Sequence, residues 1–271
     1  MARSLAVIGV GNMASAIISG IASSDIELSS IILYDKNKDQ YDRLNGCNIP
    51  LVYSDSIDEA ISAADCILLS VKPQNYIEVL SEISKVKKCS EKLYVSIGAG
   101  ITSDSVSTVL GNACVIRVLP NVPMLIGEGV SVICKNKNAT KADFDFVCAV
   151  FRSAGSVLLI DESEMNRTIG VTSSSPAYVF KFINAIYKGA LSQGLNSKEL
   201  LDSICDTVIG SALMLKGSDE SPEELIAKVA SKGGTTEQAL KTLDEYDFDK
   251  AIERAMLACT NRAEELGRSD K

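Results

Sequence analysis

Hydrophobic and polar residues alternate in two different ways along the first 160 positions of the chain. Short runs of β-branched and other apolar residues predict strands, and amphipathic stretches with helical spacing lie between them. The expected strands are Leu5–Ile8, Ile31–Tyr34, Cys66–Val71, Leu93–Ile97, Val115–Leu119 and Val130–Cys134. The expected helices between them include Asn12–Ser23, Ile57–Ala64 and Tyr76–Val86. Strands that alternate with helices favour a parallel sheet covered by helices, which is an α/β architecture.

The pattern changes after about residue 160, where the strand signals stop. Wide apolar faces at helical spacing predict helices over Pro176–Leu195, Lys198–Leu215 and Phe248–Leu266. The segment Ser221-Pro222-Glu223-Glu224 has the serine, proline and glutamate that begin a further helix. Roughly 110 residues cannot easily bury such wide faces within one subunit. We therefore expect a homodimer or a larger homo-oligomer, with helices interleaved between subunits.

The composition narrows the range of partners. The net charge is −8 and the sequence pI is about 4.8. Binding to nucleic acid or to an anionic membrane surface requires a basic patch, so neither partner is expected. No segment approaches the roughly 18 consecutive apolar residues of a membrane span, and the first apolar run is too short for a signal peptide. These features predict a cytoplasmic protein.

Histidine is absent from the chain. Its absence excludes a histidine general base, a catalytic triad built on imidazole and most zinc sites, and no metal site is expected. Chemistry performed by this chain is therefore expected to depend on the reactivity of a bound cofactor.

A glycine motif follows the first expected strand. The segment Gly9-Val10-Gly11-Asn12-Met13-Ala14 has the spacing Gly-x-Gly-x-x-Ala and opens a helix. The first glycine permits a tight turn, the second lets the backbone approach a pyrophosphate, and the third small residue lets the helix pack closely on the strand. The helix N-terminus then presents free N–H groups to the phosphates. In this context the motif predicts a Rossmann-like dinucleotide-binding domain.

Asp35 ends the second expected strand. An acidic residue there typically accepts hydrogen bonds from the ribose hydroxyls, which favours NAD(H) and repels a 2′-phosphate. Lys36 and Lys38 follow at once, and each is either a partner for such a phosphate or a solvated turn residue. The chain is expected to bind NADPH or NADH, with the preference between them left open.

Three further segments leave strands at the edge of the sheet where open α/β folds bind ligands. Leu69–Gln74 places a lysine and a proline there, although a solvated lysine at a strand end would look the same. Ser96–Thr102 is rich in small residues that allow a ligand to approach the backbone. Arg117–Pro123 holds Asn121 between two prolines, a rigid exit that aims one amide side chain.

The helical half contains one segment with a ligand-binding pattern. In Ser231–Leu240 two glycines separate two helices, Thr235 and Thr236 open the second one, and Gln238 is spaced to complete a capping box with Thr235. Helix capping explains part of this pattern, and the same groups also make a cradle for a carboxylate. The serine run in Thr172–Tyr178 fits either capping and packing or a role in a site.

Together these motifs resemble the pyrroline-5-carboxylate reductase family. The resemblance runs through almost the whole chain, and the last of its segments is the most specific. In the family's order and approximate spacing these are Gly9–Ala14, Val71–Gln74, Ser96–Thr102, Arg117–Pro123 with Gly127–Gly129, Pro176–Tyr178 and Ser231–Leu240.

The resemblance implies an architecture and an activity. Residues 1–160 would form the NAD(P)-binding Rossmann-like domain, and residues 161–271 an all-α substrate-binding and dimerisation domain. Members of the family reduce the cyclic imine 1-pyrroline-5-carboxylate to L-proline with NADPH or NADH, the last step of proline biosynthesis. Their dimers often build larger rings, so assembly up to a decamer is within the expectation.

The resemblance also implies site residues. By motif position Thr236 resembles the catalytic hydroxyl that hydrogen-bonds the imine nitrogen, and Lys72, Pro73, Gly98 and Ala99 resemble contacts to the nicotinamide. The expected substrate-binding residues are Glu162, Asp219, Ser231, Gly233, Gly234, Thr235 and Thr236. The expected cofactor-binding residues are Gly9, Val10, Gly11, Asn12, Met13, Asp35, Lys36, Ser70, Val71, Lys72, Pro73, Gly98, Ala99 and Asn121.

The chain departs from the family pattern at several positions. Thr172–Ser175 replaces a Ser-Gly-Ser-Gly-like run, and Lys232 stands where a proline is common. Ile57 stands near an asparagine that contacts the adenosine, and Asp35 replaces a serine or asparagine suited to a 2′-phosphate. These last two departures weaken the case for the usual preference for NADPH.

Two other interpretations stay open. A β-hydroxyacid dehydrogenase would use a lysine and an asparagine four residues apart on the long helix, whereas Lys181 and Asn184 are three apart. That interpretation also gives Ser231–Leu240 no role. A non-catalytic protein that senses NAD(P) would keep Gly9–Ala14 but would need no substrate cradle.

Overall fold

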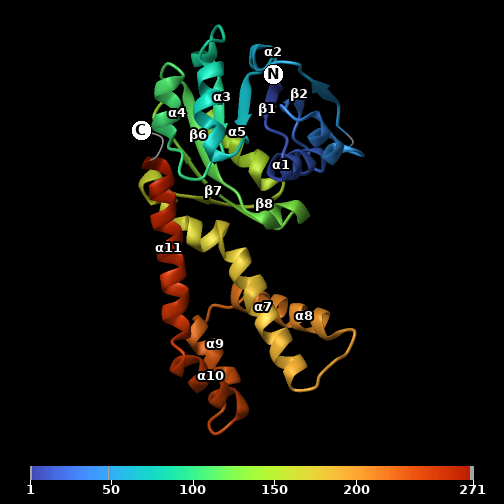
Figure 1. Ribbon diagram of the computed structural model, residues 1–271, viewed down its shortest axis with the longest axis vertical. Coiled ribbons are helices and arrows are strands. Elements are labelled where there is room, and N and C mark those ends of the chain that lie inside the picture. The colour runs from blue at the N-terminus through green and yellow to red at the C-terminus, as the bar shows by residue number, and fades with distance from the viewer. Residues whose placement is uncertain (1, 48, 269–271) are drawn as a thin grey trace. The chain divides into compact units, whose positions relative to one another are not determined.

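The computed structural model describes residues 2–47 and 49–268 (Figure 1). Among these residues, one sheet of eight strands forms in the N-terminal part. Its strands are β1 (Arg3–Ile8), β2 (Leu28–Tyr34), β3 (Leu51–Tyr53), β4 (Cys66–Leu69), β5 (Leu93–Ser96), β6 (Cys114–Leu119), β7 (Gly129–Lys135) and β8 (Gly155–Leu159). The helices that accompany them are α1 (Asn12–Ala22), α2 (Ile57–Ser62), α3 (Tyr76–Ile83), α4 (Ser103–Val109), α5 (Lys141–Arg152) and α6 (Met165–Thr168). All the expected strands and helices of this half are confirmed, with bounds that differ by a few residues.

The order of the strands places a ligand-binding crevice at the middle of the sheet. The order is β3-β2-β1-β4-β5-β6-β7-β8, and β1 pairs parallel with both β2 and β4. The chain therefore leaves β1 first toward one edge and later toward the other, which makes a topological switch point. Gly9, Asp35 and Ser70 follow β1, β2 and β4, so they lie together at the carboxyl edge of the sheet.

The sheet is not wholly parallel. β7 runs antiparallel to β6, and β8 runs parallel to β7. The link from β6 to β7 holds only the short 3-10 helix Val122–Ile126, whereas a parallel pairing needs a crossover of about a dozen residues or more. The expectation of a parallel sheet is thus right as far as β6 and incomplete beyond it.

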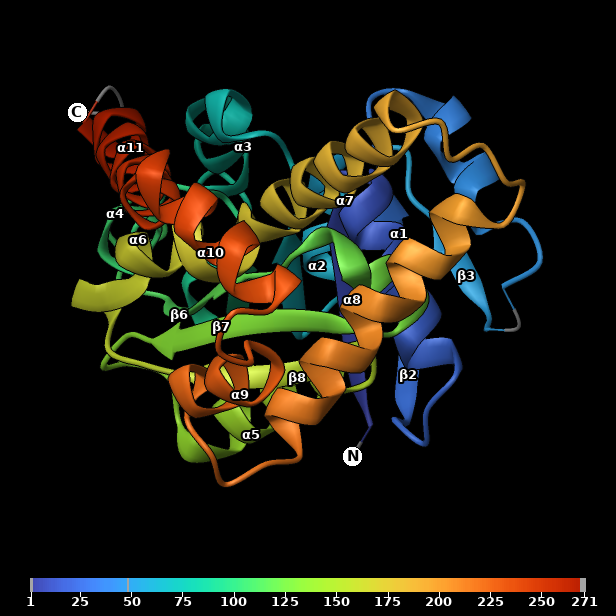
Figure 2. The ribbon, with the colours of Figure 1, turned by 90° about the horizontal axis from the view of Figure 1, so that it is seen from below.

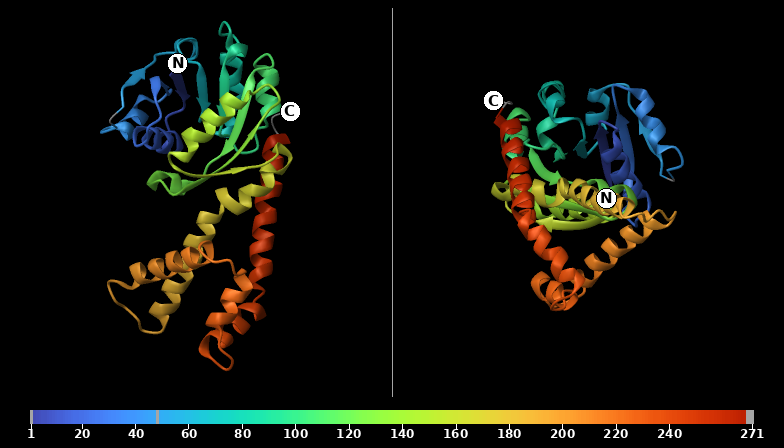
Figure 3. Two further views of the ribbon diagram at one scale, coloured as in Figure 1. Left: turned by 180° about the vertical axis from the view of Figure 1, so that it is seen from behind. Right: turned by 60° about the horizontal axis from the view of Figure 1, so that its bottom comes forward.

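Alternating side chains divide the sheet between two apolar clusters. Along β1, Leu5 and Val7 pack with residues of α1 and α5, whereas Ala6 and Ile8 pack with residues of α2, α3 and α4. Accordingly α3 and α4 lie on the face shown in Figure 1, and α1 and α5 lie on the face shown at the left of Figure 3. The two helical layers bury the central strands of the sheet and leave its carboxyl edge as the place for a ligand.

The described residues pack as two compact units. The first runs up to Ser174 and resumes at Met256, and the second spans Ser175–Ala255. The C-terminal helix α11 (Phe248–Arg268) belongs to both, and in the first unit its Ala263 packs with Leu119 of β6 and Met165 of α6. A functional boundary at residue 160 stays a prediction.

The second unit is helical, as expected. It contains α7 (Ser175–Ser192), α8 (Leu200–Lys216), α9 (Pro222–Val229), α10 (Thr235–Glu245) and the start of α11. The helix start at Ser221 is confirmed, because Ser221 and Glu224 form both bonds of a capping box. In Figure 2, α9 and α10 follow one another through a short turn.

Apolar side chains of this second unit are largely uncovered. Among its described residues only Ile204 is buried. Phe180, Leu213, Met214 and Val229 are each more than half exposed. Uncovered apolar surface of this extent marks a protein–protein interface. The described helices include none that is long and apolar enough to cross a membrane.

Candidate functional site

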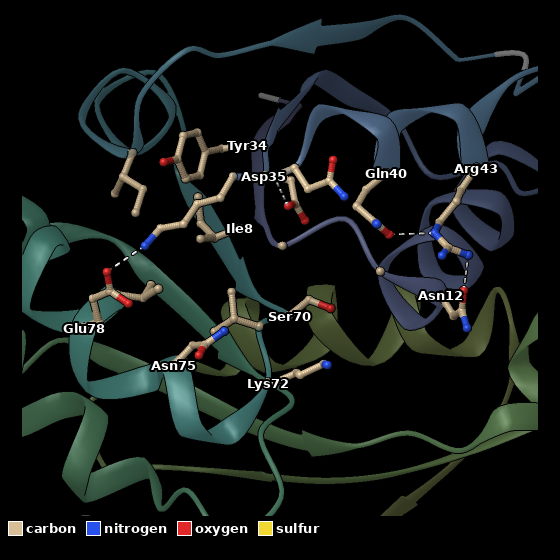
Figure 4. A pocket seen from close by; sticks show the side chains of 17 residues that line it. Ile8, Asn12, Tyr34, Asp35, Gln40, Arg43, Ser70, Lys72, Asn75 and Glu78 are labelled. Carbon is tan, nitrogen blue, oxygen red and sulfur yellow. Dashed lines mark hydrogen bonds and ion pairs between the residues drawn. The ribbon is translucent and has the colours of Figure 1, made fainter.

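A pocket of about 580 Å³ lies at the switch point (Figure 4). The segments that follow β1, β2 and β4 line it, so the structure brings together residues that are far apart in the sequence. The expected cofactor-binding residues among them are Gly9, Gly11, Asn12, Asp35, Lys36, Ser70, Val71 and Lys72. Its size and its place at the carboxyl edge fit the adenosine and phosphate part of a dinucleotide.

The two glycines of the motif have different physical roles. Gly9 adopts φ +93°, and a Cβ there would lie 2.9 Å from the Ser70 carbonyl oxygen, so neither the conformation nor the space suits another residue. A Cβ on Gly11 would meet nothing within 4 Å. Gly11 therefore leaves space for a ligand. It also caps α1 without a side-chain hydrogen bond, so the N–H groups of the first turn remain available to phosphates.

The Asp35 carboxylate is held in place by two backbone N–H groups. Val10 donates to its Oδ2 at 2.7 Å, and Asn37 donates to its Oδ1 at 2.8 Å. The first bond ties the end of β2 to the glycine turn after β1. A carboxylate oxygen can accept more than one hydrogen bond, so Asp35 can also accept from a ribose hydroxyl.

A second hollow of about 300 Å³ adjoins the first and shares Gly11, Asn12 and Lys72 with it. It adds the expected residues Met13, Pro73, Gly98 and Ala99, together with Ser173. Ser173 lies at the end of a π-helical turn, Ile169–Ser173, and its buried hydroxyl has no hydrogen-bond partner within the described part of the chain. The hollow is the expected position of the nicotinamide, next to the phosphate-binding turn.

Gly98 is fixed by a buried tyrosine. A Cβ on Gly98 would lie 2.7 Å from the Tyr76 ring. The Tyr76 hydroxyl donates to the Leu69 carbonyl at 2.8 Å and accepts from the Ser96 hydroxyl at 3.1 Å. Burial raises the pKa of Tyr76 to about 12, so the phenol stays neutral. Tyr76 thus ties the ends of β4 and β5 together beneath the second hollow.

Asn121 is not among the residues that line either pocket. Its Oδ1 accepts from the Val130 N–H at 2.8 Å, and its Nδ2 donates to the Thr172 carbonyl at 3.0 Å. The side chain is buried and joins β7 to the π-helical turn. Its expected contact with the cofactor stays a prediction, because the structure gives both ends of the amide other partners.

Several residues of the large pocket were not expected. Arg43 lies on the 3-10 helix Lys38–Leu44, where it donates from Nε to Gln40 at 2.8 Å and from Nη1 to the Asn12 side chain. Glu78 reaches the pocket from α3 and accepts from Lys36. The other lining residues outside the expected set are Ile8, Tyr34, Asn37, Gln40, Ile57, Asn75 and Val79.

Glu162 is bound within the first unit. Its carboxylate accepts from the Ser103 N–H at 2.6 Å and from the Ser103 hydroxyl, at the start of α4. It also lies 3.6 Å from the Arg117 guanidinium. These bonds occupy much of the carboxylate, and its expected contact with the substrate stays a prediction.

The remaining substrate-site residues lie in the second unit. Gly233 has φ +74°, the Gly234 N–H donates to the Ser231 carbonyl at 2.9 Å, and a Cβ on Gly234 would lie 2.7 Å from the Ser231 hydroxyl. Gly234 caps α10, which makes Thr235 and Thr236 its first residues. The structure therefore brings Ser231, both glycines and both threonines into one turn.

The expected capping box between Thr235 and Gln238 is wrong. Thr235 lies inside the helix, and Glu237 instead accepts from the Gly233 N–H at 2.6 Å. That bond takes one of the N–H groups expected to bind a carboxylate, whereas the first N–H groups of α10 have no acceptor within the helix. Asp219 is exposed in the link between α8 and α9.

Comparisons with known proteins cover the whole chain. The family model for pyrroline-5-carboxylate reductase dimerisation matches residues 162–266, and the model for coenzyme F420-dependent NADP oxidoreductases matches residues 4–100. The pyrroline-5-carboxylate reductase of Escherichia coli strain K12 is 36% identical over 99% of this chain and 100% of its own length. The chain belongs to the pyrroline-5-carboxylate reductase family.

Solved structures of the family have the same fold along the same length. The pyrroline carboxylate reductase of Plasmodium falciparum, solved with NADP bound, is 29% identical, with a TM-score of 0.88 over 98% of each chain. The reductase of Streptococcus pyogenes is 26% identical, with a TM-score of 0.88 over 97% of this chain and 99% of its own. Membership of this family, with a dimerisation region over the helical half, leaves the β-hydroxyacid dehydrogenase interpretation without support.

Proposed function

We propose that this protein is a pyrroline-5-carboxylate reductase that converts 1-pyrroline-5-carboxylate to L-proline with NADPH or NADH. The observation that carries the proposal is the similarity to named reductases over nearly the full length of both chains. The two adjoining pockets at the switch point support it, because they provide an open glycine turn, an uncapped helix start and a fixed Asp35 for a dinucleotide. The bound nicotinamide supplies the hydride, and the chain supplies binding and orientation.

The substrate imine has two groups for the protein to recognise, a carboxylate and a ring nitrogen. In our proposal the turn from Ser231 to Thr235, with Gly233 and Gly234, binds the carboxylate through the N-terminus of α10. Thr236, two residues into that helix, holds the imine nitrogen by its hydroxyl and relays a proton to it from water. Glu162 and Asp219 would provide acidic surroundings that favour a protonated imine.

We further propose distinct roles for the two halves of the chain. Residues 1–160 bind the cofactor, and residues 161–271 bind the substrate and join subunits. The uncovered apolar side chains of α7, α8 and α9 support a homodimer with interleaved helices, and further association of dimers would give rings up to a decamer. We propose that the enzyme works in the cytoplasm.

Purified protein incubated with NADH, and separately with NADPH, tests the activity. The proposal requires loss of absorbance on addition of pyrroline-5-carboxylate, together with formation of an equal amount of proline. A short-chain β-hydroxyacid with NAD is the comparison for the dehydrogenase interpretation, and it should give no reaction. Cofactor binding without turnover of the imine would instead identify a non-catalytic sensor.

A further inference from the structure

The cations that follow Asp35 already have acidic partners. Lys36 donates from Nζ to the Glu78 carboxylate at 2.6 Å, and Lys38 donates to the Asp55 carboxylate at 2.6 Å. Both lysines are candidates for binding the 2′-phosphate of NADP(H), because they directly follow the residue that contacts the ribose. In this structure, neither lysine has a free positive charge to offer such a phosphate.

The two acidic partners differ in position. Glu78 lines the large pocket together with Lys36, whereas Asp55 and Lys38 are not among its lining residues. Figure 4 shows Asp35 and Glu78 at different sides of the pocket, and the dashed line at Glu78 marks its ion pair with Lys36. Glu78 comes from α3, which follows β4, so it belongs to the opposite side of the switch point from β2. The ion pair therefore joins the two walls of the pocket at the ribose end.

The charges at the ribose end of the pocket disfavour the additional 2′-phosphate of NADP(H). Asp35 is fixed by the N–H groups of Val10 and Asn37, and Glu78 lines the same pocket from the opposite wall. The Glu78 carboxylate balances the charge of Lys36, and the hydrogen bond that Lys36 donates to Glu78 raises the pKa of Lys36, so the ammonium stays charged. Arg43 also lines the pocket, where it donates hydrogen bonds to the neutral side chains of Asn12 and Gln40 beside the glycine turn.

We infer that Glu78 sets the cofactor preference of this chain toward NADH, by holding Lys36 in an ion pair and away from the position of a 2′-phosphate. The inference rests on the proposed cofactor site. It assigns to Asp35 the repulsion of the additional phosphate, and to Glu78 the capture of the lysine that would otherwise bind that phosphate. Glu78 thus acts as a specificity-determining residue that touches the cofactor site from α3.

The two side chains of the pair are more than half exposed, so the effect of Glu78 should be moderate. Exposed pairs and like charges near a protein surface change binding by a factor of about five. We expect the wild-type protein to bind NADH about tenfold more tightly than NADPH, with Asp35 and Glu78 both contributing. The Glu78→Gln variant should bind NADPH about fivefold more tightly and NADH with less than a twofold change.

The experiment is a titration of the wild type, Glu78→Gln and Glu82→Gln with NADH and with NADPH. The fluorescence of the reduced nicotinamide reports the binding. Glu82 is the matched control, because it lies one turn further along α3 and lines a neighbouring hollow instead of the cofactor pocket. Its substitution removes the same charge and should change the ratio of the two dissociation constants by less than twofold. Thermal melting of each variant establishes that it is folded.

Three results would overturn the inference. Equal affinity of the wild type for both nucleotides, an unchanged ratio in Glu78→Gln, or the same change in Glu82→Gln would each show that Glu78 does not select the cofactor. Failure of the folded wild type to bind either nucleotide would contradict the proposed function itself, so the two failures are distinguishable. Titrations with adenosine 5′-phosphate and adenosine 2′,5′-bisphosphate test whether the change in affinity depends on the 2′-phosphate. Glu78→Gln should change the affinity for the bisphosphate alone.

Discussion

Glu162 and Arg117 form an ion pair, 3.6 Å apart, in which the arginine is almost completely buried. Arg117 lies in β6 and donates from Nη2 to Asn166 of α6 at 2.9 Å, and its Nε has no hydrogen-bond partner among the described residues. Burial lowers the pKa of Arg117, and the charge of Glu162 opposes that shift. Through Ser103 the same carboxylate holds the start of α4, so it joins β6 to the loop that contains Gly98 and Ala99.

Removing one partner of this pair should destabilise the protein strongly. Arg117→Met leaves Glu162 without its cation, and such a loss typically costs about 3–5 kcal/mol for a buried pair. Glu162 is partly exposed, so we expect about 3 kcal/mol, measured by denaturant unfolding at pH 7. The control is Arg262→Met, which breaks the exposed pair Arg262–Glu265 and should cost less than about 0.5 kcal/mol. Equal effects of the two substitutions would mean that the buried pair has no special role.

In the expected cofactor-binding half of the chain, the sequence alone predicts the site where one short segment determines both the backbone conformation and the contact with a ligand. Gly9–Ala14 is such a segment, because the strand, the turn and the helix start are consecutive in the sequence. Arg43 and Glu78 could not be predicted in this way. Arg43 reaches the pocket from a 3-10 helix after β2 and Glu78 from the first turn of α3, and only the packing of these elements brings them together.

The other differences from the sequence prediction have separate causes. β8 was not expected from the sequence, because its pairing depends on a contact between distant residues. A Cβ on Gly155 would lie 2.0 Å from the Gly129 carbonyl oxygen, where β8 pairs with β7. Helix α5 has a complete capping box between Thr140 and Asp143, a signal in the sequence that would have identified it. The cofactor contact expected of Asn121 stays a prediction, and its amide also hydrogen-bonds the Val130 N–H and the Thr172 carbonyl, which a rigid strand exit allows as well.

Substituting the two motif glycines should separate folding from cofactor binding. Gly9→Ala forces a side chain into φ +93° and against the Ser70 carbonyl, so we expect a clear fall in melting temperature. Gly11→Ala places its Cβ in open space, so the fold should be unchanged, while NADH binding should weaken about tenfold or more because the Cβ occupies the approach of the pyrophosphate. Melting curves and NADH titrations of both variants check this. Unchanged NADH affinity in Gly11→Ala would place the pyrophosphate elsewhere.

The stability of the first unit should depend on pH through Asp65. Ser4 donates to its Oδ2 from the backbone at 3.0 Å and from the hydroxyl at 2.8 Å, which lowers the pKa of Asp65 below its usual 3.8. A carboxyl whose pKa is lower in the folded state stabilises the fold above the unfolded pKa, and this contribution disappears as the pH falls through the folded pKa.

The Asp65→Asn variant measures this contribution. It should be less stable than the wild type at pH 7 by about 1 kcal/mol, a low value because Asp65 is exposed. The difference should shrink as the pH is lowered below about 3.8. Ser4→Ala removes one of the donors and should show the same trend with a smaller amplitude. A difference that is constant across the pH range would exclude the charge of Asp65 as the cause.

Replacing Thr236 should affect turnover much more than cofactor binding. A positioned proton donor typically contributes about 10²–10⁴-fold, and a neutral hydroxyl belongs at the low end, so Thr236→Ala should reduce kcat about 10²-fold. The control is Thr242→Ala on the same helix, whose hydroxyl only bonds to the Gln238 carbonyl at 3.1 Å. It should retain kcat within about twofold. Unchanged kcat in Thr236→Ala would remove Thr236 from the reaction.

The most direct test of the account follows the hydride itself. The purified protein is mixed with pyrroline-5-carboxylate and NADH that carries deuterium at both C4 positions, and the product is analysed by mass spectrometry. The account predicts proline with one deuterium on the former imine carbon, in an amount equal to the NADH consumed. Proline without deuterium, or oxidation of the cofactor without proline, would contradict hydride transfer to the imine by this chain.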